Sequence, residues 1–146
     1  MACDSSLVRA SASVSVIWRR WREDPARWSL FVIAAGTLAS GLFLMVAPGF
    51  VLDILSAPTT TSDRLFFAII GMFMAVVGGT LTQSLLLPLP GALVVGWSAL
   101  QKFGASAAMS LAVALNVFSY YGIALAAFDF CSALLALMYW RRLHAR

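Results

Sequence analysis

The fold is decided by residues 91–140, GALVVGWSALQKFGASAAMSLAVALNVFSYYGIALAAFDFCSALLALMYW. Two apolar runs, residues 91–115 and 121–140, flank a short turn, and each run holds one charged residue, Lys102 or Asp129. Each charge lies 11 positions from the outer end of its run, so in an antiparallel hairpin the two would lie at similar depth. Because a charge at the centre of a bilayer costs about 2.5–3.5 kcal/mol, we expect the two side chains to pair.

The composition of the whole chain sets the broad class. Of 146 residues, 62% are hydrophobic and only 11% are charged, which the surface of a soluble domain of this size cannot accommodate. Four runs are each close to the roughly 20 residues that cross a bilayer as a helix. The ten-residue alternation typical of membrane strands is absent. We therefore predict an all-α polytopic membrane protein, an antiparallel four-helix transmembrane bundle with spans at 28–46, 65–87, 91–115 and 121–140.

The distribution of lysine and arginine predicts the orientation. Basic residues gather in the N-terminal segment, residues 1–27, and in the tail, residues 141–146, whereas the first loop carries Arg64 against Asp53 and Asp63. Cytoplasmic flanks are enriched in lysine and arginine. The sequence therefore predicts a multi-pass membrane protein with both termini on the cytoplasmic side.

The N-terminal segment also shows helical periodicity. Val14, Ile17, Trp18 and Trp21 recur at helical spacing among arginines, which predicts an amphipathic helix lying in the lipid headgroups. The net charge of +4 resides at the ends of the spans, where anionic lipid and topology account for it. We therefore expect the lipid bilayer, and no nucleic acid, as the partner of these basic residues.

The first loop contains a second interfacial segment. Pro48 and Gly49 end the first span, and residues 50–55 form a short apolar piece. Residues 58–63 then resemble a turn that leads to the N-cap of the second helix. We expect a structural role for this loop.

Small residues at four-residue spacing predict close helix packing, because in lipid the approach of backbones replaces the hydrophobic effect between helices. Such spacing supports a tight bundle and, more weakly, a homo-oligomer. The predicted packing residues are Gly36 and Ser40 on the first span, Gly71, Ala75 and Gly79 on the second, and Gly104 and Ala108 on the third.

Polar residues predict a cluster around the charged pair. On the fourth span, the face of Asp129 carries small residues that pack against protein rather than lipid. On the second span, Thr80, Gln83 and Ser84 share a face near the cytoplasmic end. The candidate ligand-binding or ion-pair residues are Lys102, Asp129, Gln101, Gln83, Ser98 and Ser132. Two interpretations stay open: an ion pair that sets the register of two helices, or a site for an anion, a proton or the head of an amphipathic molecule.

Familiar catalytic and metal-binding patterns do not occur in the sequence. His144 is the one histidine and lies in the basic tail, while Cys3 and Cys131 are far apart and form no CxxC motif. Cys131 is interpreted as a small packing residue. We therefore predict no catalytic residue, no metal site and no cofactor.

The arrangement of spans resembles the small four-helix membrane proteins of the DoxX-like group. The likeness covers roughly residues 28–142 and lies in the proline-ended first helix at Ala47, Pro48 and Gly49 and in the Gly-rich second helix that begins LFFAIIG at Leu65. This resemblance implies an accessory or subunit-like membrane protein, since some relatives accompany quinol-oxidising or thiol-redox systems. It transfers no catalytic residue to this chain.

Three functional hypotheses follow. The first is a non-enzymatic accessory or interaction subunit, bound to a membrane-protein partner or to itself, whose Lys102 and Asp129 stabilise the bundle or bind a hydrophobic small molecule. The second is a small oligomeric transporter or exporter that uses the same pair. The third is a membrane-embedded enzyme acting on a lipid or isoprenoid, with Asp129 as acid or base.

Overall fold

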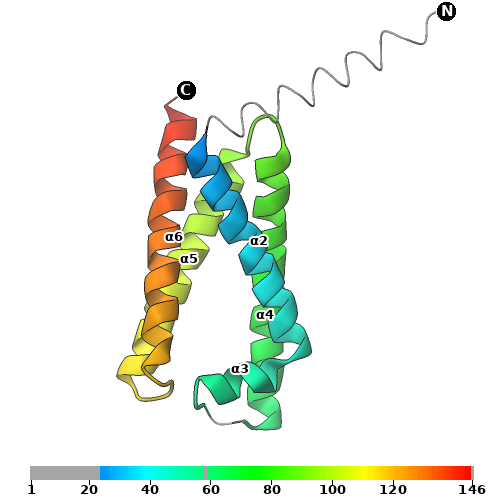
Figure 1. Cartoon of the computed structure of the whole chain (residues 1–146), viewed down its shortest axis with the longest axis vertical. Coiled ribbons are helices and arrows are strands. Elements are labelled where there is room, and N and C mark those ends of the chain that lie inside the picture. Colours follow the sequence, from blue (N-terminus) through cyan, green and yellow to red (C-terminus); the bar gives the residue numbers. More distant parts are fainter. Residues whose placement is uncertain (1–23, 58, 146) are drawn as a thin grey trace, which may run out of the picture.

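The computed structural model describes residues 24–57 and 59–145, and this part of the chain is helical, without strands. Each predicted span falls on one helix. The predicted amphipathic helix around Val14 to Trp21 lies outside the described residues. In chain order the helices are α2 (Pro25–Val46), α3 (Pro48–Ile54), α4 (Thr61–Leu86), α5 (Ala92–Ala114) and α6 (Tyr121–His144), as Figure 1 shows.

Three of the described helices, α2, α4 and α6, are long and apolar enough to cross a membrane. Helix α5 has a comparable length of 23 residues but is not among them. Its sequence contains Gln101 and Lys102 in direct succession, and these residues lower its hydropathy. The prediction of an all-helical fold is thus confirmed for the described residues, and three of the four predicted spans are long and apolar enough to cross a membrane.

Local sequence explains where the helices begin and end. Asp24 accepts a hydrogen bond from the Arg27 backbone and caps α2, whose first residue is Pro25. Thr60 and Asp63 form a capping box at the start of α4, within the segment where an N-cap was expected. Asn116 adopts a φ of 57° just beyond α5, a left-handed conformation that asparagine tolerates well.

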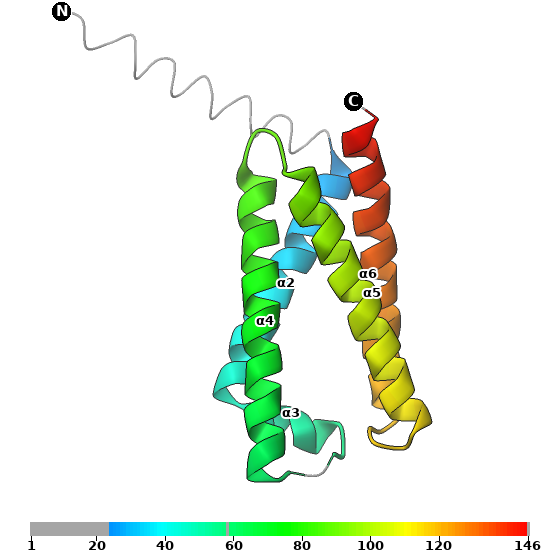
Figure 2. The ribbon, with the colours of Figure 1, turned by 180° about the vertical axis from the view of Figure 1, so that it is seen from behind.

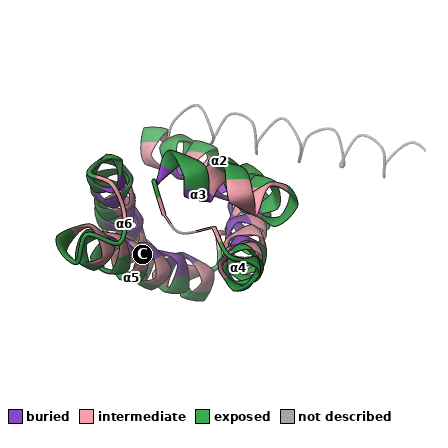
Figure 3. Ribbon diagram, turned by 90° about the horizontal axis from the view of Figure 1, so that it is seen from below, coloured by how far each residue is buried: buried purple, intermediate pink, exposed green. Residues whose placement is uncertain are grey.

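The helices associate as two antiparallel pairs. Helix α2 packs along α4, and α5 packs along α6, while contacts between the pairs are fewer. The pairs come together at the end where α2 begins and α6 ends, and diverge toward α3, as both side views show (Figures 1 and 2). Buried residues face the inside of this arrangement (Figure 3). The core between the pairs contains Leu30, Ala34, Leu81, Leu85, Val95, Ala99, Ala136 and Tyr139.

The diverging ends of the pairs are bridged by α3. The backbone N–H of Ser119, in the turn between α5 and α6, donates to the Leu55 carbonyl at 2.9 Å. The rings of Phe67 and Phe118 meet edge to face with centroids 5.9 Å apart. The predicted interfacial segment is therefore a short helix that links α4 to the α5–α6 turn.

Glycines allow the close approach of α2 and α4. A Cβ on Gly71 would lie 2.6 Å from the Gly41 carbonyl oxygen, and a Cβ on Gly78 would lie 2.6 Å from the Leu38 nitrogen. A Cβ on Gly41 would lie 2.5 Å from the backbone nitrogen of Ala75. Gly71 and Ala75 thus pack as expected, but they pack against α2 of the same chain.

The other predicted packing residues lie elsewhere. A Cβ on Gly79 would make only an ordinary contact, 3.8 Å from the Leu38 side chain, so Gly78 takes the place expected for Gly79. Gly36, Ser40, Gly104 and Ala108 are all exposed, and Cβ atoms on Gly36 and Gly104 would meet nothing within 4 Å. Small residues do recur at four-residue spacing on these helices, but the spacing does not show which face of a helix meets its neighbour.

Arg27 has a structural role that its place in the basic flank did not indicate. Arg27 is only 5% exposed, and its side chain donates from Nε to the Leu85 carbonyl at 3.0 Å and from Nη2 to the Leu87 carbonyl. These carbonyls belong to the C-terminal end of α4, where the helix has no N–H groups left to satisfy them. A cation also interacts favourably with the negative end of the helix dipole. Arg27 therefore ties the start of α2 to the end of α4.

Candidate functional site

Lys102 and Asp129 form an ion pair between α5 and α6. The Lys102 Nζ lies 2.6 Å from Asp129 Oδ1. The side chain of Lys102 is 10% exposed and that of Asp129 is 22% exposed. The ring of Phe128 lies 5.6 Å from the ammonium, measured to its centroid, and contributes a cation–π contact. The two charges expected to meet are therefore in direct contact.

Helix periodicity explains why the two side chains face one another. Ala126, Ser132, Ala133 and Ala136, which share the face of Asp129, are all buried. On α5, Ser98 and Ser106 lie on the side of Lys102 and are also buried. Small residues on both faces let the two backbones approach closely enough for a short lysine–aspartate contact.

Ser106 adds a second polar link between α5 and α6, on the side of the ion pair that lies toward the α5–α6 turn. Its hydroxyl donates to the Ala126 carbonyl at 2.8 Å. Ser106 lies four residues after Lys102 and therefore on the same face of α5, but its acceptor is a backbone oxygen that no sequence pattern marks. A buried hydroxyl bonded across helices adds to the specific registration of α5 against α6.

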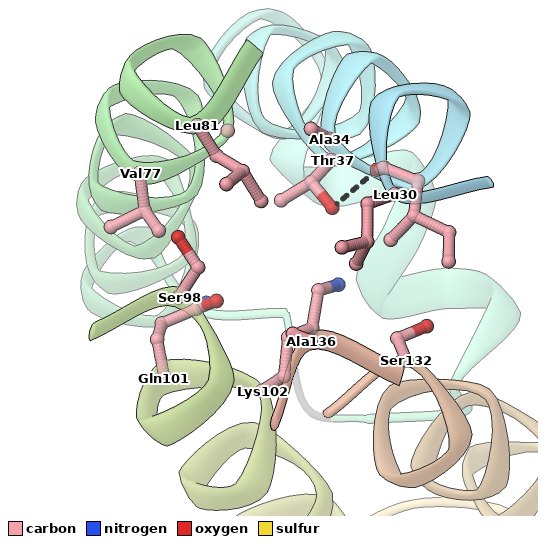
Figure 4. A pocket seen from close by; sticks show the side chains of 12 residues that line it. Leu30, Ala34, Thr37, Val77, Leu81, Ser98, Gln101, Lys102, Ser132 and Ala136 are labelled. Atoms are coloured by element: carbon pink, nitrogen blue, oxygen red, sulfur yellow. Dashed lines mark hydrogen bonds between the residues drawn. The ribbon is translucent and has the colours of Figure 1, made fainter. Parts of the chain in front are cut away.

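A cavity of about 10 Å³ lies beside the ion pair, where all four long helices meet. The side chains of Lys102, Gln101 and Thr37 extend toward this space, as Figure 4 shows. A cavity of this size is close to the minimum that holds one water molecule. The lining residues are Leu30, Ile33, Ala34, Thr37, Val77, Gly78, Leu81, Ser98, Gln101, Lys102, Ser132 and Ala136.

Most hydroxyl protons around the cavity are already used within single helices. Thr37, Ser98 and Ser132 each donate to the carbonyl four residues earlier, at 2.9, 2.8 and 2.7 Å respectively. Gln101 differs, because its Oε1 is buried and has no hydrogen-bond partner among the described residues. The surface that faces the cavity is almost entirely apolar, because the polar atoms of its lining residues are turned to partners or covered by neighbouring atoms.

The structure brings together most, but not all, of the predicted polar residues. Lys102, Gln101, Ser98 and Ser132 all line the cavity. Gln83 is exposed on α4 and does not take part, so its inclusion in the cluster was wrong. Thr37 was missed, because a single threonine in an apolar helix is common and no neighbouring residue singled it out.

Other residues of the expected polar face have local roles. Thr80 is exposed, and its hydroxyl donates to the Val76 carbonyl of its own helix at 2.9 Å. The buried Ser84 hydroxyl accepts a hydrogen bond from the Gly91 backbone at 2.9 Å and so fixes the turn between α4 and α5. These residues stabilise α4 and its turn rather than extending the site.

The remaining reactive side chains lie apart from the ion pair. Cys131 is exposed on α6, so it is not the internal packing residue expected from its size. His144 is exposed near the C-terminus, with Nδ1 3.0 Å from the Trp140 carbonyl oxygen. Within residues 24–57 and 59–145, no group of three or more histidine, cysteine, aspartate or glutamate residues is placed to hold a metal ion.

Comparison of the chain with protein-family models, with curated proteins and with solved structures found no match. The function of the chain is therefore inferred from the geometry of the site. That geometry consists of a short ion pair, a helix-to-helix hydroxyl contact and a small cavity of about 10 Å³.

Proposed function

We propose that this protein is a non-enzymatic accessory subunit of the membrane, in which four spanning helices form a scaffold that docks against another membrane protein. In this proposal the Lys102 and Asp129 pair holds α5 and α6 in register. The observation that carries it is that the two charges satisfy each other within the chain, beside a cavity of only about 10 Å³. A pair engaged in this way is typical of a structural element, since a substrate passage needs more room beside its charges.

The proposal includes α5 as a fourth membrane span. Helix α5 accompanies α6 over its whole length: Gly96 approaches the Trp140 ring at one end, and Gly122 approaches Val113 at the other. If α6 crosses the bilayer, the helix packed antiparallel along it crosses too. The polar Lys102 is turned toward α6, and the large outward residues of α5 are apolar, which suits a lipid-facing surface. These outward residues are Leu93, Trp97, Leu100 and Leu111, followed by Leu115 at the C-cap.

The proposed orientation places both termini on the cytoplasmic side. Exposed Arg141 and Arg142 lie at the end of α6, at the same end of the molecule as the start of α2 (Figure 1). Exposed aromatic side chains lie near both ends of the helices, with Trp28 and Trp97 at this end and Tyr120 and Tyr121 at the other. Aromatic residues favour the two membrane interfaces, and basic residues favour the cytoplasmic one.

Labelling of single cysteines tests the fourth span. In a chain carrying Cys3→Ser and Cys131→Ser, we expect Leu89→Cys, in the α4–α5 turn, and Tyr120→Cys, in the α5–α6 turn, to lie on opposite sides of the membrane. A membrane-impermeant maleimide applied to sealed, oriented vesicles should label one variant before permeabilisation and the other only afterwards. Labelling of both variants from the same side would rule out α5 as a span.

The outward face of α5 is the proposed docking surface. Gly104 and Ala108 are exposed there, and a Cβ on Gly104 would meet nothing within 4 Å. In lipid, small residues four apart let the backbone of a second helix approach closely. The transmembrane helix of another membrane protein is therefore the proposed occupant. The resemblance to the DoxX-like group points to the same class of role.

Replacement of Gly104 by leucine tests the docking surface. We expect Gly104→Leu to reduce the native complex at least about tenfold, which corresponds to about 1.4 kcal/mol of lost association free energy. The measurement is native electrophoresis of the tagged protein, at its natural expression level, from membranes dissolved in a mild detergent. The matched control is Gly36→Leu, because Gly36 on α2 is also exposed with open space around it. A monomeric wild-type protein, or a complex that tolerates Gly104→Leu, would contradict the proposal.

A further inference from the structure

We propose that Asp129 is the polar end of a binding site for a neutral, largely apolar molecule that carries one hydroxyl group, such as a long-chain alcohol. The site lies between the two helix pairs, on the side of the ion pair that faces α3. It needs only the membrane placement of α5 and α6, so it stands apart from the proposed docking of α5 against a partner. A ligand held there leaves the ion pair intact and does not change its structural role.

The carboxylate of Asp129 has one oxygen atom that the protein does not bond. Oδ1 accepts from the Lys102 ammonium at 2.6 Å, but within the described residues Oδ2 accepts no hydrogen bond. The described side-chain atoms that are both buried and unpartnered are Gln101 Oε1 and Ser119 Oγ. Oδ2 is not one of them, and the side chain of Asp129 is 22% exposed, so this oxygen is open to a molecule from outside the chain.

A free carboxylate oxygen at this depth calls for a hydrogen-bond donor. Asp129 lies eight residues after Tyr121, about 12 Å along α6, a helix long and apolar enough to cross a membrane. The hydrocarbon around such a helix offers no donor. An ionised carboxylate accepts through both of its oxygens, and its hydrogen bonds are stronger than those of neutral acceptors. A bound molecule with a single donor would therefore complete the polar contacts of Asp129.

The inner faces of α4 and α6 are accessible next to Asp129. Leu125 lies seven residues before Ser132, two helical turns away, and therefore shares its face; on α4, Ile70 stands in the same relation to Val77. Ser132 and Val77 line the small cavity between the pairs. Leu125 is nevertheless 48% exposed and Ile70 is 47% exposed, whereas Ser132 is 3% exposed. As the pairs diverge (Figures 1 and 2), they thus leave an apolar space between α4 and α6.

Helix α3 and the residues after it cover the end of this space. Leu52 and Leu55 are buried, although they lie at the end where the pairs diverge. The backbone N–H of Ser119 donates to the Leu55 carbonyl and joins this segment to the α5–α6 turn. The end of the space is therefore closed, while its sides face lipid. A membrane-soluble molecule would enter from the side, between the two pairs.

The charges around the space select a neutral ligand. The ammonium of Lys102 repels a cation, and the carboxylate of Asp129 repels an anion. Leu125 and Ile70 favour an apolar body, since ligand sites combine apolar walls with a few polar groups that fix the orientation of the ligand. One hydroxyl group supplies the missing donor, whereas a molecule without a donor leaves Oδ2 unpaired.

Photolabelling tests the site in the purified protein, reconstituted in phosphatidylcholine vesicles. The probe is a long-chain alcohol with a diazirine group in its chain, and labelled residues are located by mass spectrometry of peptides. We expect labelling of α6 near Leu125 that excess hexadecanol suppresses. Hexadecyl methyl ether has a similar shape but no donor, so it should compete at least about tenfold less well. Equal competition by the alcohol and the ether, or by neither, would overturn the proposal and reduce the labelling to adventitious contact with lipid.

Two variants separate the space from the acceptor. Leu125→Trp fills the space without touching the ion pair, so labelling of α6 should fall at least about fivefold. The matched control is Ile123→Trp, because Ile123 is also exposed on α6 but lies on another face. Lys102→Met with Asp129→Leu removes the acceptor without leaving a lone charge, and in this variant alcohol and ether should compete equally. A preference for the alcohol that survives in either the Leu125→Trp protein or the double variant would contradict the proposal.

Discussion

Replacing Asp129 by leucine alone is expected to destabilise the protein by about 3–5 kcal/mol, because it leaves the Lys102 charge buried without a partner. Leucine branches at Cγ as aspartate does, so the change removes the charge and keeps the branching of the side chain. Lys102→Met should cost a similar amount by leaving the Asp129 carboxylate unpaired. The measurement is the free energy of unfolding of the purified protein in mixed micelles.

Cys131→Leu provides the control for these changes. Cys131 lies two residues beyond Asp129 on α6 but is exposed, so a leucine there should change the free energy of unfolding by less than about 0.5 kcal/mol. An Asp129→Leu variant as stable as this control would show that the ammonium finds another counter-charge or reaches water, and that the ion pair does not hold α6 in place.

Adding one methyl group to Gly78 is expected to produce the second large effect. A Cβ there would lie 2.6 Å from the Leu38 nitrogen and 3.0 Å from the Ala34 carbonyl oxygen, which are both backbone atoms of α2. Backbone atoms cannot avoid the added methyl group by a change of rotamer, as a side chain can. Gly78→Ala should therefore force α2 and α4 apart and lower the free energy of unfolding by about 1–3 kcal/mol. The free energy of unfolding again provides the measurement.

The neighbouring glycine provides a matched control. A Cβ on Gly79 would make an ordinary contact 3.8 Å from the end of the Leu38 side chain. Alanine is the better helix former, so Gly79→Ala should raise stability by up to about 1 kcal/mol. Equal effects at the two positions, or a larger loss at Gly79, would show that α4 presents a different face to α2.

Much of the architecture follows from local features of the sequence. Proline and capping residues mark helix ends because their effects depend on the adjacent backbone: Pro48 follows the end of α2, and Thr60 caps α4. The contact between Lys102 and Asp129 was predictable for two reasons. Their positions within two antiparallel runs place them at similar depth, and the free-energy cost of a lone charge in lipid favours their pairing.

The packing positions and side-chain partners that the sequence did not predict depend on contacts between distant segments. Small residues lie on more than one face of a helix, so spacing alone did not distinguish Gly78 from Gly79 or Gly41 from Gly36. The role of Arg27 depends on the end of α4 lying beside the start of α2, which no local pattern reveals. Gln83 was assigned to the polar cluster because it shares a helical face with Thr80 and Ser84, but its side chain is exposed on α4.

The double variant Lys102→Met with Asp129→Leu tests the central claim, that the ion pair is a structural link between α5 and α6. The measurement is its free energy of unfolding compared with those of the two single variants and the wild-type protein. If the claim is correct, removing both charges removes the penalty of an unpaired charge, and the double variant should recover to within about 1 kcal/mol of wild type. If the two single losses in free energy of unfolding simply add, the side chains do not act as a pair, and the ion pair is not a structural link between α5 and α6.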